Sequence, residues 1–295
     1  MLLPYPLMPF SFSSLWALLR LMRPHQWVKN VFVFAGLVFS QRWEVLPLDF
    51  AVLRAFAAFC CASSLVYILN DWHDRASDAL HPVKRKRPLA SGAVTAAQAL
   101  VLAAALLVAG ILFADGNRTL LMLLALYVVL NMVYSWRLKQ VPVVDVAIIA
   151  AGFMLRLLAG TVAVGIAPSR WLLLTGIFMT LYLGFCKRKA ESFQEEASQR
   201  AVMAGYPPAL LDTYIATTMT ATLTTYSLFA TSPEAQFQHS ERLLYTVPVV
   251  IFALLRYTYQ VHRGHGEDVA RDLLRDAWLL GAGVLWLLIF LSHRF

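Results

Sequence analysis

Nine long apolar stretches take up most of this 295-residue chain, and they constrain its fold more than any other feature. An α-helix needs about 20 apolar residues to cross a bilayer, so stretches of this length predict transmembrane helices. Only 14% of the residues are charged, which excludes an ordinary soluble domain. We predict an all-α membrane protein with spans at 26–41, 50–70, 95–114, 118–136, 142–165, 170–187, 208–231, 244–262 and 272–293.

The spans leave little room for a separate soluble domain, so we expect residues 20–295 to form a single nine-helix transmembrane domain. Residues 1–19 are rich in proline and contain neither lysine nor arginine, which is not typical of a signal peptide. We interpret them as a tail or an interfacial segment. The first span is the shortest, and Lys29 and Asn30 interrupt it.

The basic residues between the spans predict how the chain is oriented. With the N-terminus inside and the C-terminus outside, the inner segments carry 17 lysines and arginines and the outer segments carry 5. This bias is typical of a multi-pass protein of the cell (inner) membrane with a cytoplasmic basic face. It accounts for the net charge of +8 without nucleic acid, although the same loops would attract phosphorylated substrates or anionic lipid.

Three aspartates follow the second apolar stretch at the spacing i, i+3 and i+7. Asp71, Asp74 and Asp78 would share one stripe of a helix, where they would repel each other unless a cation lay between them. A hard divalent ion such as Mg²⁺ prefers oxygen ligands of this kind. The alternative is a solvated loop whose aspartates pair with its own lysines. The regular spacing, directly after Asn70, favours the metal site.

Basic residues surround these carboxylates in the predicted inner loops. The run Lys84–Arg87 follows the aspartates, and Lys187, Arg188, Lys189 and Glu191 lie in the loop after the sixth span. Carboxylates beside many cations suit a complex of Mg²⁺ with a diphosphate, because the metal bridges phosphate oxygens and the cations neutralise the remaining charge.

The motif from Asn70 to Asp78, with the run His81–Gly92 behind it, resembles the first aspartate motif of the UbiA-type intramembrane prenyltransferases. The run Tyr134–Lys139 also matches a pattern of that family, and the similarity extends from Leu21 to the end. The resemblance implies nine helices around a central cavity that opens near the cytoplasmic face.

One branch of the family fits better than the aromatic prenyltransferases. The runs Arg23–Asn30, Val141–Arg156 and Lys187–Glu191, followed by Arg200 and Tyr206, resemble the decaprenyl-phosphate phosphoribosyltransferase branch. Aromatic prenyltransferases carry a second aspartate-rich motif after the sixth span, where this chain has lysine, arginine and glutamate.

This resemblance implies a Mg²⁺-dependent transfer of 5-phosphoribose from phosphoribosyl pyrophosphate to a polyprenyl phosphate, with release of diphosphate, for arabinofuranose donors of cell-envelope glycans. It makes Asp71, Asp74 and Asp78 the catalytic metal ligands. The substrate-binding residues would be Lys29, Asn70, Lys84, Lys86, Arg87, Tyr134, Lys139, Asp145, Arg156, Lys187, Arg188 and Glu191.

Asp145 and Arg156 lie 11 residues apart in one predicted span, about three helical turns, so they share a face. At that separation they cannot pair directly, and a charge inside a membrane needs a partner or a cavity. We expect each to have another partner. Arg156 is either a structural charge or part of a lipid tunnel, and Arg256 raises the same question.

Two other functions compete with this one. A UbiA-type prenyltransferase would move an isoprenoid from its diphosphate to an aromatic or tetrapyrrole acceptor, and the aspartate motif alone fits this reaction too. A transporter of phosphorylated metabolites would show inverted repeats and charges at the bilayer midplane, which the sequence lacks. The expected partners are therefore phosphoribosyl pyrophosphate, polyprenyl phosphate and membrane lipid. The sequence leaves polyprenyl length and homo-oligomer formation open.

Overall fold

The computed structural model describes residues 12–40, 46–193, 201–233, 241–266 and 269–292, and every regular element in them is helical. The fold class predicted from the apolar stretches, an all-α protein, is confirmed for these residues. Arg200 and most of the predicted 1–19 segment lie outside the described residues.

Seven predicted stretches coincide with single helices, with differences of a few residues at their ends. These helices are α3 (Leu46–His73), α5 (Ala96–Phe113), α6 (Arg118–Trp136), α7 (Val144–Ala163), α8 (Arg170–Glu191), α9 (Pro208–Thr231) and α11 (Thr246–His262). Local signals set several starts: Thr95 and Gln98 form a capping box before α5, and the Ser169 side chain accepts the Leu172 N–H at the start of α8.

The other two stretches differ from the prediction. Residues 26–41 fall mostly in a 3₁₀ helix, η1 (Pro24–Phe34), which continues into α2 (Ala35–Ser40). Residues 272–293 are divided between α12 (Val269–Arg275) and α13 (Ala277–Leu291). The break occurs because the Asp276 carboxylate caps α13, accepting two of its first backbone N–H groups.

Five of the described helices are long and apolar enough to cross a membrane: Phe50–His73, Ala96–Phe113, Arg118–Trp136, Val144–Ala163 and Arg242–His262. The apolar helix Ala277–Leu291 is shorter than a usual span, and α8 and α9 are long enough but less apolar. The described residues therefore do not confirm the predicted number of nine spans.

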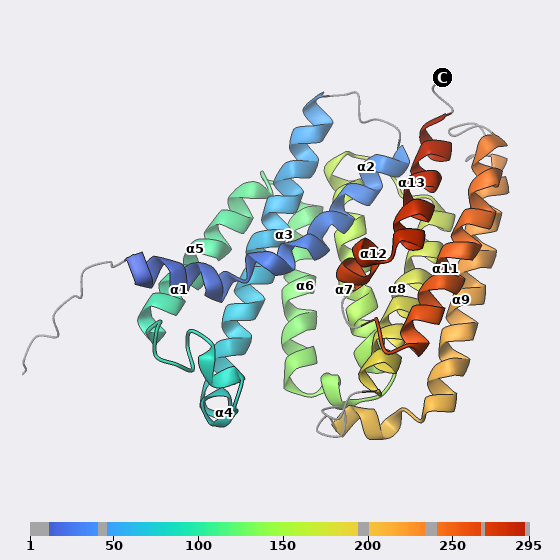
Figure 1. The fold of residues 1–295 in the computed structure, drawn as a ribbon. Coiled ribbons are helices and arrows are strands. Elements are labelled where there is room, and N and C mark those ends of the chain that lie inside the picture. The colour runs from blue at the N-terminus through green and yellow to red at the C-terminus, as the bar shows by residue number, and fades with distance from the viewer. Residues whose placement is uncertain (1–11, 41–45, 194–200, 234–240, 267–268, 293–295) are drawn as a thin grey trace, which may run out of the picture. The chain divides into compact units, whose positions relative to one another are not determined.

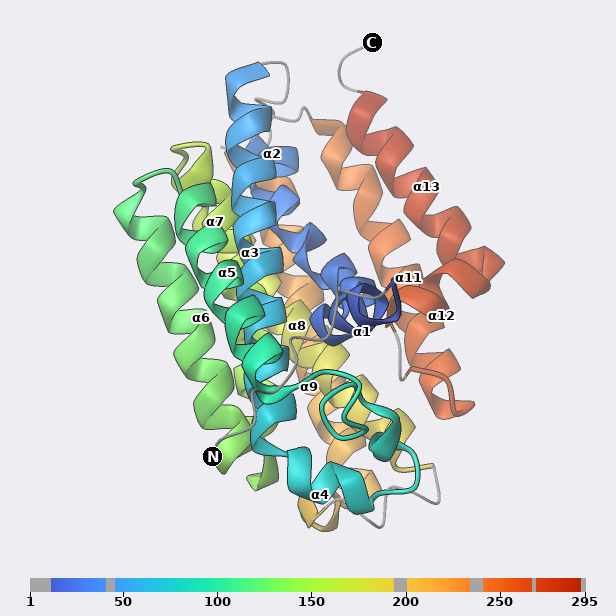
Figure 2. The same cartoon turned by 90° about the vertical axis from the view of Figure 1, so that its left-hand side faces the viewer.

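The chain divides into two compact units, and the first comprises residues 1–132 and 155–166. In this unit α3 packs against α1 (Phe12–Met22), η1 and α5 (Figure 2). The end of α7 approaches η1 so closely that a Cβ on Gly160 would lie 1.8 Å from the Val33 carbonyl oxygen. Only glycine permits this contact, as at many helix crossings in membranes.

The second unit comprises residues 133–154 and 167–295. In it α8 packs along α9, and α11 contacts α8, α9 and α13 (Figure 1). The core of this unit contains Tyr182, whose hydroxyl donates to the Leu254 carbonyl at 2.9 Å. Short 3₁₀ helices η3 (Leu138–Gln140), η5 (Ala201–Gly205) and η6 (Glu241–Tyr245) join the longer ones.

Candidate functional site

The aspartate motif lies where α3 ends and α4 (Arg75–Leu80) begins. Asp71 is in the last turn of α3 and Asp78 is in α4, and both are buried, with 2% and 3% of their surface exposed. Asp74 lies in the turn between the helices. Backbone hydrogen bonds from Asp74 N–H to Asn70 and from Asp78 N–H to Asp74 keep a helical path through this turn.

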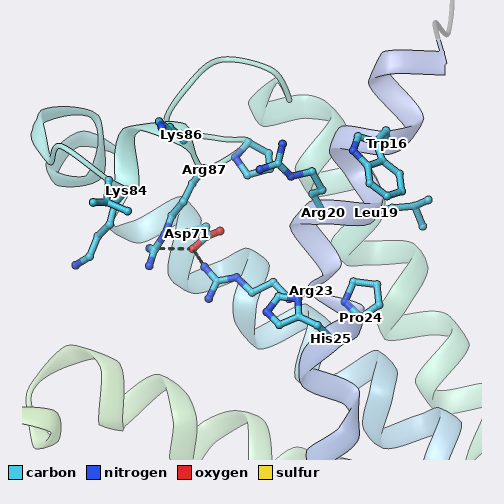
Figure 3. Close-up of a pocket in the computed structure, with 12 residues that line it drawn as sticks. Trp16, Leu19, Arg20, Arg23, Pro24, His25, Asp71, Lys84, Lys86 and Arg87 are labelled. Atoms are coloured by element: carbon cyan, nitrogen blue, oxygen red, sulfur yellow. Dashed lines mark hydrogen bonds and ion pairs between the residues drawn. The ribbon is translucent and has the colours of Figure 1, made fainter. Parts of the chain in front are cut away.

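Two arginines of the same unit hold the buried aspartates. Arg87 donates to Asp78 Oδ2 at 2.6 Å and to Asp71 Oδ1 at 3.2 Å. Arg23 donates to the same Asp71 oxygen at 2.6 Å (Figure 3). The predicted repulsion between the carboxylates is thus relieved by cations of the chain itself.

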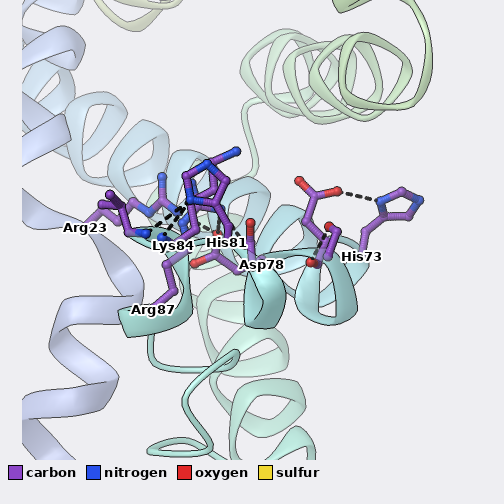
Figure 4. Close-up of polar contacts among 10 residues, drawn as sticks. Arg23, His73, Asp78, His81, Lys84 and Arg87 are labelled. Carbon is purple, nitrogen blue, oxygen red and sulfur yellow. Dashed lines mark hydrogen bonds and ion pairs between the residues drawn. The ribbon is translucent and has the colours of Figure 1, made fainter. Parts of the chain in front are cut away.

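Asp74 has a different environment from the other two aspartates. Its Oδ1 lies 3.0 Å from Nδ1 of His73, a contact that Figure 4 draws as a dashed line. Of the Asp74 side chain, 34% is exposed. In the part of the chain that the structure describes, no three His, Cys, Asp or Glu side chains are gathered closely enough to hold a metal ion. Two of the three predicted metal ligands, Asp71 and Asp78, therefore bind Arg87. The Asp74 side chain would have to turn away from His73 to join them.

A cavity of about 820 Å³ opens beside Asp71 in this unit. Its charged lining consists of five cations and one carboxylate: Arg20, Arg23, Lys84, Lys86, Arg87 and Asp71. Its other lining residues are Trp16, Leu19, Pro24, His25, Val83 and Pro88 (Figure 3). Such an excess of positive charge suits an anion with several phosphate oxygens.

The basic wall of the cavity comes from the loop that contains η2 (Lys84–Lys86). His81 organises this loop, because its Nδ1 accepts the backbone N–H groups of Val83 at 3.2 Å and Lys84 at 3.4 Å (Figure 4). Lys84, Lys86 and Arg87, three of the predicted phosphate-binding residues, all line the cavity. Arg85 is exposed and lies outside the lining.

Arg23 was not among the predicted site residues. Its backbone is left-handed, with φ 53°, which is uncommon for a residue with a side chain and stores strain of a kind found at functional sites. Its guanidinium also lies over the Tyr67 ring, 4.9 Å from the centroid. The only sign of this position in the sequence is the Arg23–Pro24 pair. Pro24 is the first residue of η1, so Arg23 lies at the turn that precedes this helix.

A second cluster of charges lies in the other unit. Asp145, with 0% exposure, accepts from Arg188 Nε at 2.8 Å and from the Tyr206 hydroxyl at 2.5 Å. Arg188 also donates to Glu191. Three predicted substrate-binding residues are therefore bound to one another, and Tyr206 joins them. Burial, and after it the hydrogen bond to Asp145, raises the pKa of Tyr206, so its hydroxyl stays a donor.

Backbone strain accompanies this second cluster too. Val143 has φ 68°, rare for a β-branched residue, and its N–H donates to the Tyr206 oxygen at 2.6 Å. Lys189, the neighbour of Arg188, is held by Asp212 at 2.9 Å.

Arg156 has its own partners, as predicted. Its Nε donates to Asn30 Oδ1 at 2.7 Å and its Nη2 to the Tyr127 hydroxyl at 2.9 Å, all within the first unit. Arg256 pairs with Asp276 at 2.7 Å, which answers the question that its position in an apolar helix raised.

The remaining predicted binding residues lie nearer the surface. In the first unit, Lys29 is exposed on η1 and Asn70 is half-buried at the end of α3. In the second unit, Tyr134 interacts electrostatically with Arg188, and Lys139 and Lys187 are half-buried.

Comparisons with known proteins extend over most of the chain. A model of the UbiA prenyltransferase family matches residues 30–280. The decaprenyl-phosphate phosphoribosyltransferase of Corynebacterium glutamicum is 34% identical over 286 residues, covering 91% of this chain and 84% of that protein. The protein of the same name from Mycobacterium tuberculosis is 33% identical over 282 residues, covering 90% and 92%.

The fold has solved counterparts. A UbiA homologue from Archaeoglobus fulgidus, bound to GPP and Mg²⁺, superposes with a TM-score of 0.68 at 20% sequence identity and covers 93% of this chain and 96% of its own. At that identity the likeness supports the fold alone.

Proposed function

Because the chain belongs to the UbiA prenyltransferase family, whose members are transferases, we propose that it moves 5-phosphoribose from phosphoribosyl pyrophosphate to a polyprenyl phosphate of the decaprenyl type. Diphosphate is released. The product would serve as a precursor of arabinofuranose donors for cell-envelope glycans. The proposed location is the cell membrane, with nine crossings, the N-terminus and the site on the cytoplasmic side, and the C-terminus outside.

The observation that carries this proposal is the charge of the cavity, where five cations face one carboxylate. Phosphoribosyl pyrophosphate and a polyprenyl phosphate both bring phosphate groups, so this reaction places more negative charge in the site than a transfer to a neutral aromatic acceptor. Trp16 and Leu19 of α1 add apolar surface beside these cations, which suits the first isoprene units of a lipid phosphate.

Mg²⁺ fits the chemistry of the aspartates, because carboxylate oxygens are the ligands it prefers. Asp71 and Asp78 would hold it, with Asp74 once it turns from His73. Bound there, the ion would neutralise charge that develops on the leaving diphosphate.

The chain's own residues would then act by charge and position. Lys84, Lys86 and Arg87 bind phosphate oxygens and stabilise the diphosphate as its bond to the anomeric carbon breaks. An oxygen of the lipid phosphate attacks that carbon and forms the new bond. A phosphate monoester is already ionised, so the step needs no strong general base. Lys29, Asn70, Tyr134, Lys139, Asp145, Arg156, Lys187, Arg188 and Glu191 remain proposed binding residues.

The test uses purified chain in detergent with phosphoribosyl pyrophosphate labelled in the ribose, a polyprenyl phosphate and Mg²⁺. We expect label to enter the lipid fraction and chelation of the metal to stop transfer. If the lipid stays unlabelled while an isoprenyl diphosphate reacts with an aromatic acceptor, the chain is a prenyltransferase of the aromatic type.

Asp74→Asn probes the metal ligands without disturbing a buried ion pair, because Asp74 is partly exposed. We expect at least a hundredfold loss of kcat with an unchanged melting temperature, since a lost charged ligand removes several kcal/mol of transition-state stabilisation, roughly 3. Asp115→Asn is the matched control: this exposed aspartate of the same unit pairs with Arg54. Full activity of Asp74→Asn would remove Asp74 from the site.

A further inference from the structure

Arg87 occupies the position between Asp71 and Asp78 where the sequence analysis expected a metal ion. We propose that Arg87, together with Arg23, neutralises these aspartates until a metal–diphosphate complex arrives, and that the arginines then exchange carboxylate for phosphate. Metal binding would therefore depend on the diphosphate. This inference rests on the proposed function only in that the substrate carries a diphosphate.

The contacts show that arginine holds one oxygen of each aspartate. Asp71 Oδ1 accepts from both arginines, at 2.6 Å and 3.2 Å, and Asp78 Oδ2 accepts from Arg87 at 2.6 Å. Both carboxylates are buried, so loss of the arginines would leave two poorly solvated negative charges. A metal ion can reach these oxygens only when Arg87 moves away.

Charge balance explains why the ion alone would bind weakly. Two aspartates and two arginines already cancel, so a divalent cation would leave an excess of positive charge in a poorly solvated place. It would also separate the arginines from their carboxylates. A diphosphate that enters with the cation compensates for both losses, because it supplies negative charge and acceptor oxygens for the guanidinium groups.

The arginines need only a short movement to make this exchange. Both line the cavity that would receive the diphosphate (Figure 3). About 30% of the Arg87 side chain is exposed. Arg87 follows η2, in a loop held by His81, so its side chain can turn towards the cavity while its backbone stays in place. Lys84 and Lys86 face the same space.

Calorimetry on the substrate-free chain in detergent tests the proposal. Arg87→Gln frees Asp78 and leaves Asp71 with Arg23 alone. We expect its affinity for Mg²⁺ alone to exceed that of the unmodified chain by roughly 10- to 100-fold, the value of one or two charged hydrogen bonds. Arg85→Gln is the matched control, because Arg85 is the exposed neighbour outside the cavity. It should bind Mg²⁺ like the unmodified chain.

Thermal unfolding gives a second readout. The unmodified chain should gain stability from Mg²⁺ and inorganic pyrophosphate together and little from Mg²⁺ alone, whereas Arg87→Gln should gain it from Mg²⁺ alone. If Arg87→Gln does not fold, Arg23→Gln removes one of the two arginine contacts of Asp71, leaves Asp78 with Arg87, and should give a smaller gain in affinity. Equal Mg²⁺ affinity in the unmodified chain and the folded variants overturns the inference.

The two proposals fail in different ways. The first outcome is that the chain does not transfer phosphoribose but its Arg87→Gln variant gains Mg²⁺ affinity. This result refutes the proposed function and supports the exchange, because an isoprenyl diphosphate could bind the arginines in the same way. A chain that transfers phosphoribose without this gain keeps its function and has no exchange of partners at Arg87.

Discussion

The buried cluster around Asp145 allows a sharp test of whether Arg188 serves the structure or the substrate. Arg188→Gln removes the cation but keeps a polar side chain of similar length. Asp145 has 0% exposure, and of the two hydrogen bonds described above it would retain the one from the Tyr206 hydroxyl at 2.5 Å. If the cluster is structural, the variant should be strongly destabilised.

The magnitude follows from the burial of both partners. Removing one member of a buried ion pair costs about 3–5 kcal/mol, because the other charge stays buried without compensation. Both side chains are at most 5% exposed, so solvent screening reduces this little. For a chain of this size the loss corresponds to a fall in melting temperature of roughly 10 °C.

The assay is thermal unfolding in detergent, followed by substrate kinetics on whatever variant folds. The double variant Asp145→Asn/Arg188→Gln is the matched control, because it removes both charges and should recover more than half of the lost stability. The reasoning is refuted if Arg188→Gln melts within 1–2 °C of the unmodified chain, roughly the effect of a surface substitution. A raised KM with unchanged melting would instead support the predicted role of Arg188 in substrate binding.

Two further predictions concern helix contacts and caps. Gly160→Ala should prevent folding or lower stability by about 3 kcal/mol, because its Cβ would collide with the Val33 carbonyl. The control Gly281→Ala, where a Cβ meets no neighbour, should be neutral or stabilising, and equal melting of the two variants would contradict the packing argument. Asp276→Ala should lower the free energy of unfolding by about 1–3 kcal/mol, and with it the melting temperature, because it removes the cap of α13 and the partner of Arg256. An unchanged melting curve would exclude both roles.

Periodicity and length predicted most of the helices, because long apolar stretches leave the chain few alternatives to a helix in or near a membrane. The start of α6 at Arg118 and its end at Trp136 agree with the sequence prediction, as do those of α9. The break at Asp276 was missed because the charged residues before it and the apolar residues after it both suit a helix. Arg256, which holds the capping carboxylate of Asp276, lies 20 residues away in the sequence.

The sequence predicted where the aspartates lie better than it predicted their contacts. Spacing placed Asp71 and Asp78 on the same side of the helix end, and both are buried there. It could not foresee that Arg23, 48 residues from Asp71, would bind this carboxylate, because such contacts depend on how α1 and α3 pack. The contact between Arg188 and Asp145 could not be predicted either, because these residues are 43 positions apart in the sequence and meet only when α7 and α8 fold together.

The 3₁₀ conformation of η1 changes how far its residues reach. A 3₁₀ helix rises about 2.0 Å per residue and an α-helix about 1.5 Å. The 11 residues of η1 and the 6 of α2 therefore extend over roughly 31 Å, whereas the same residues would cover roughly 25 Å in a continuous α-helix. The hydrocarbon layer is about 30 Å thick. In this conformation the backbone of the shortest apolar stretch has a length close to the thickness of that layer, without a single additional residue.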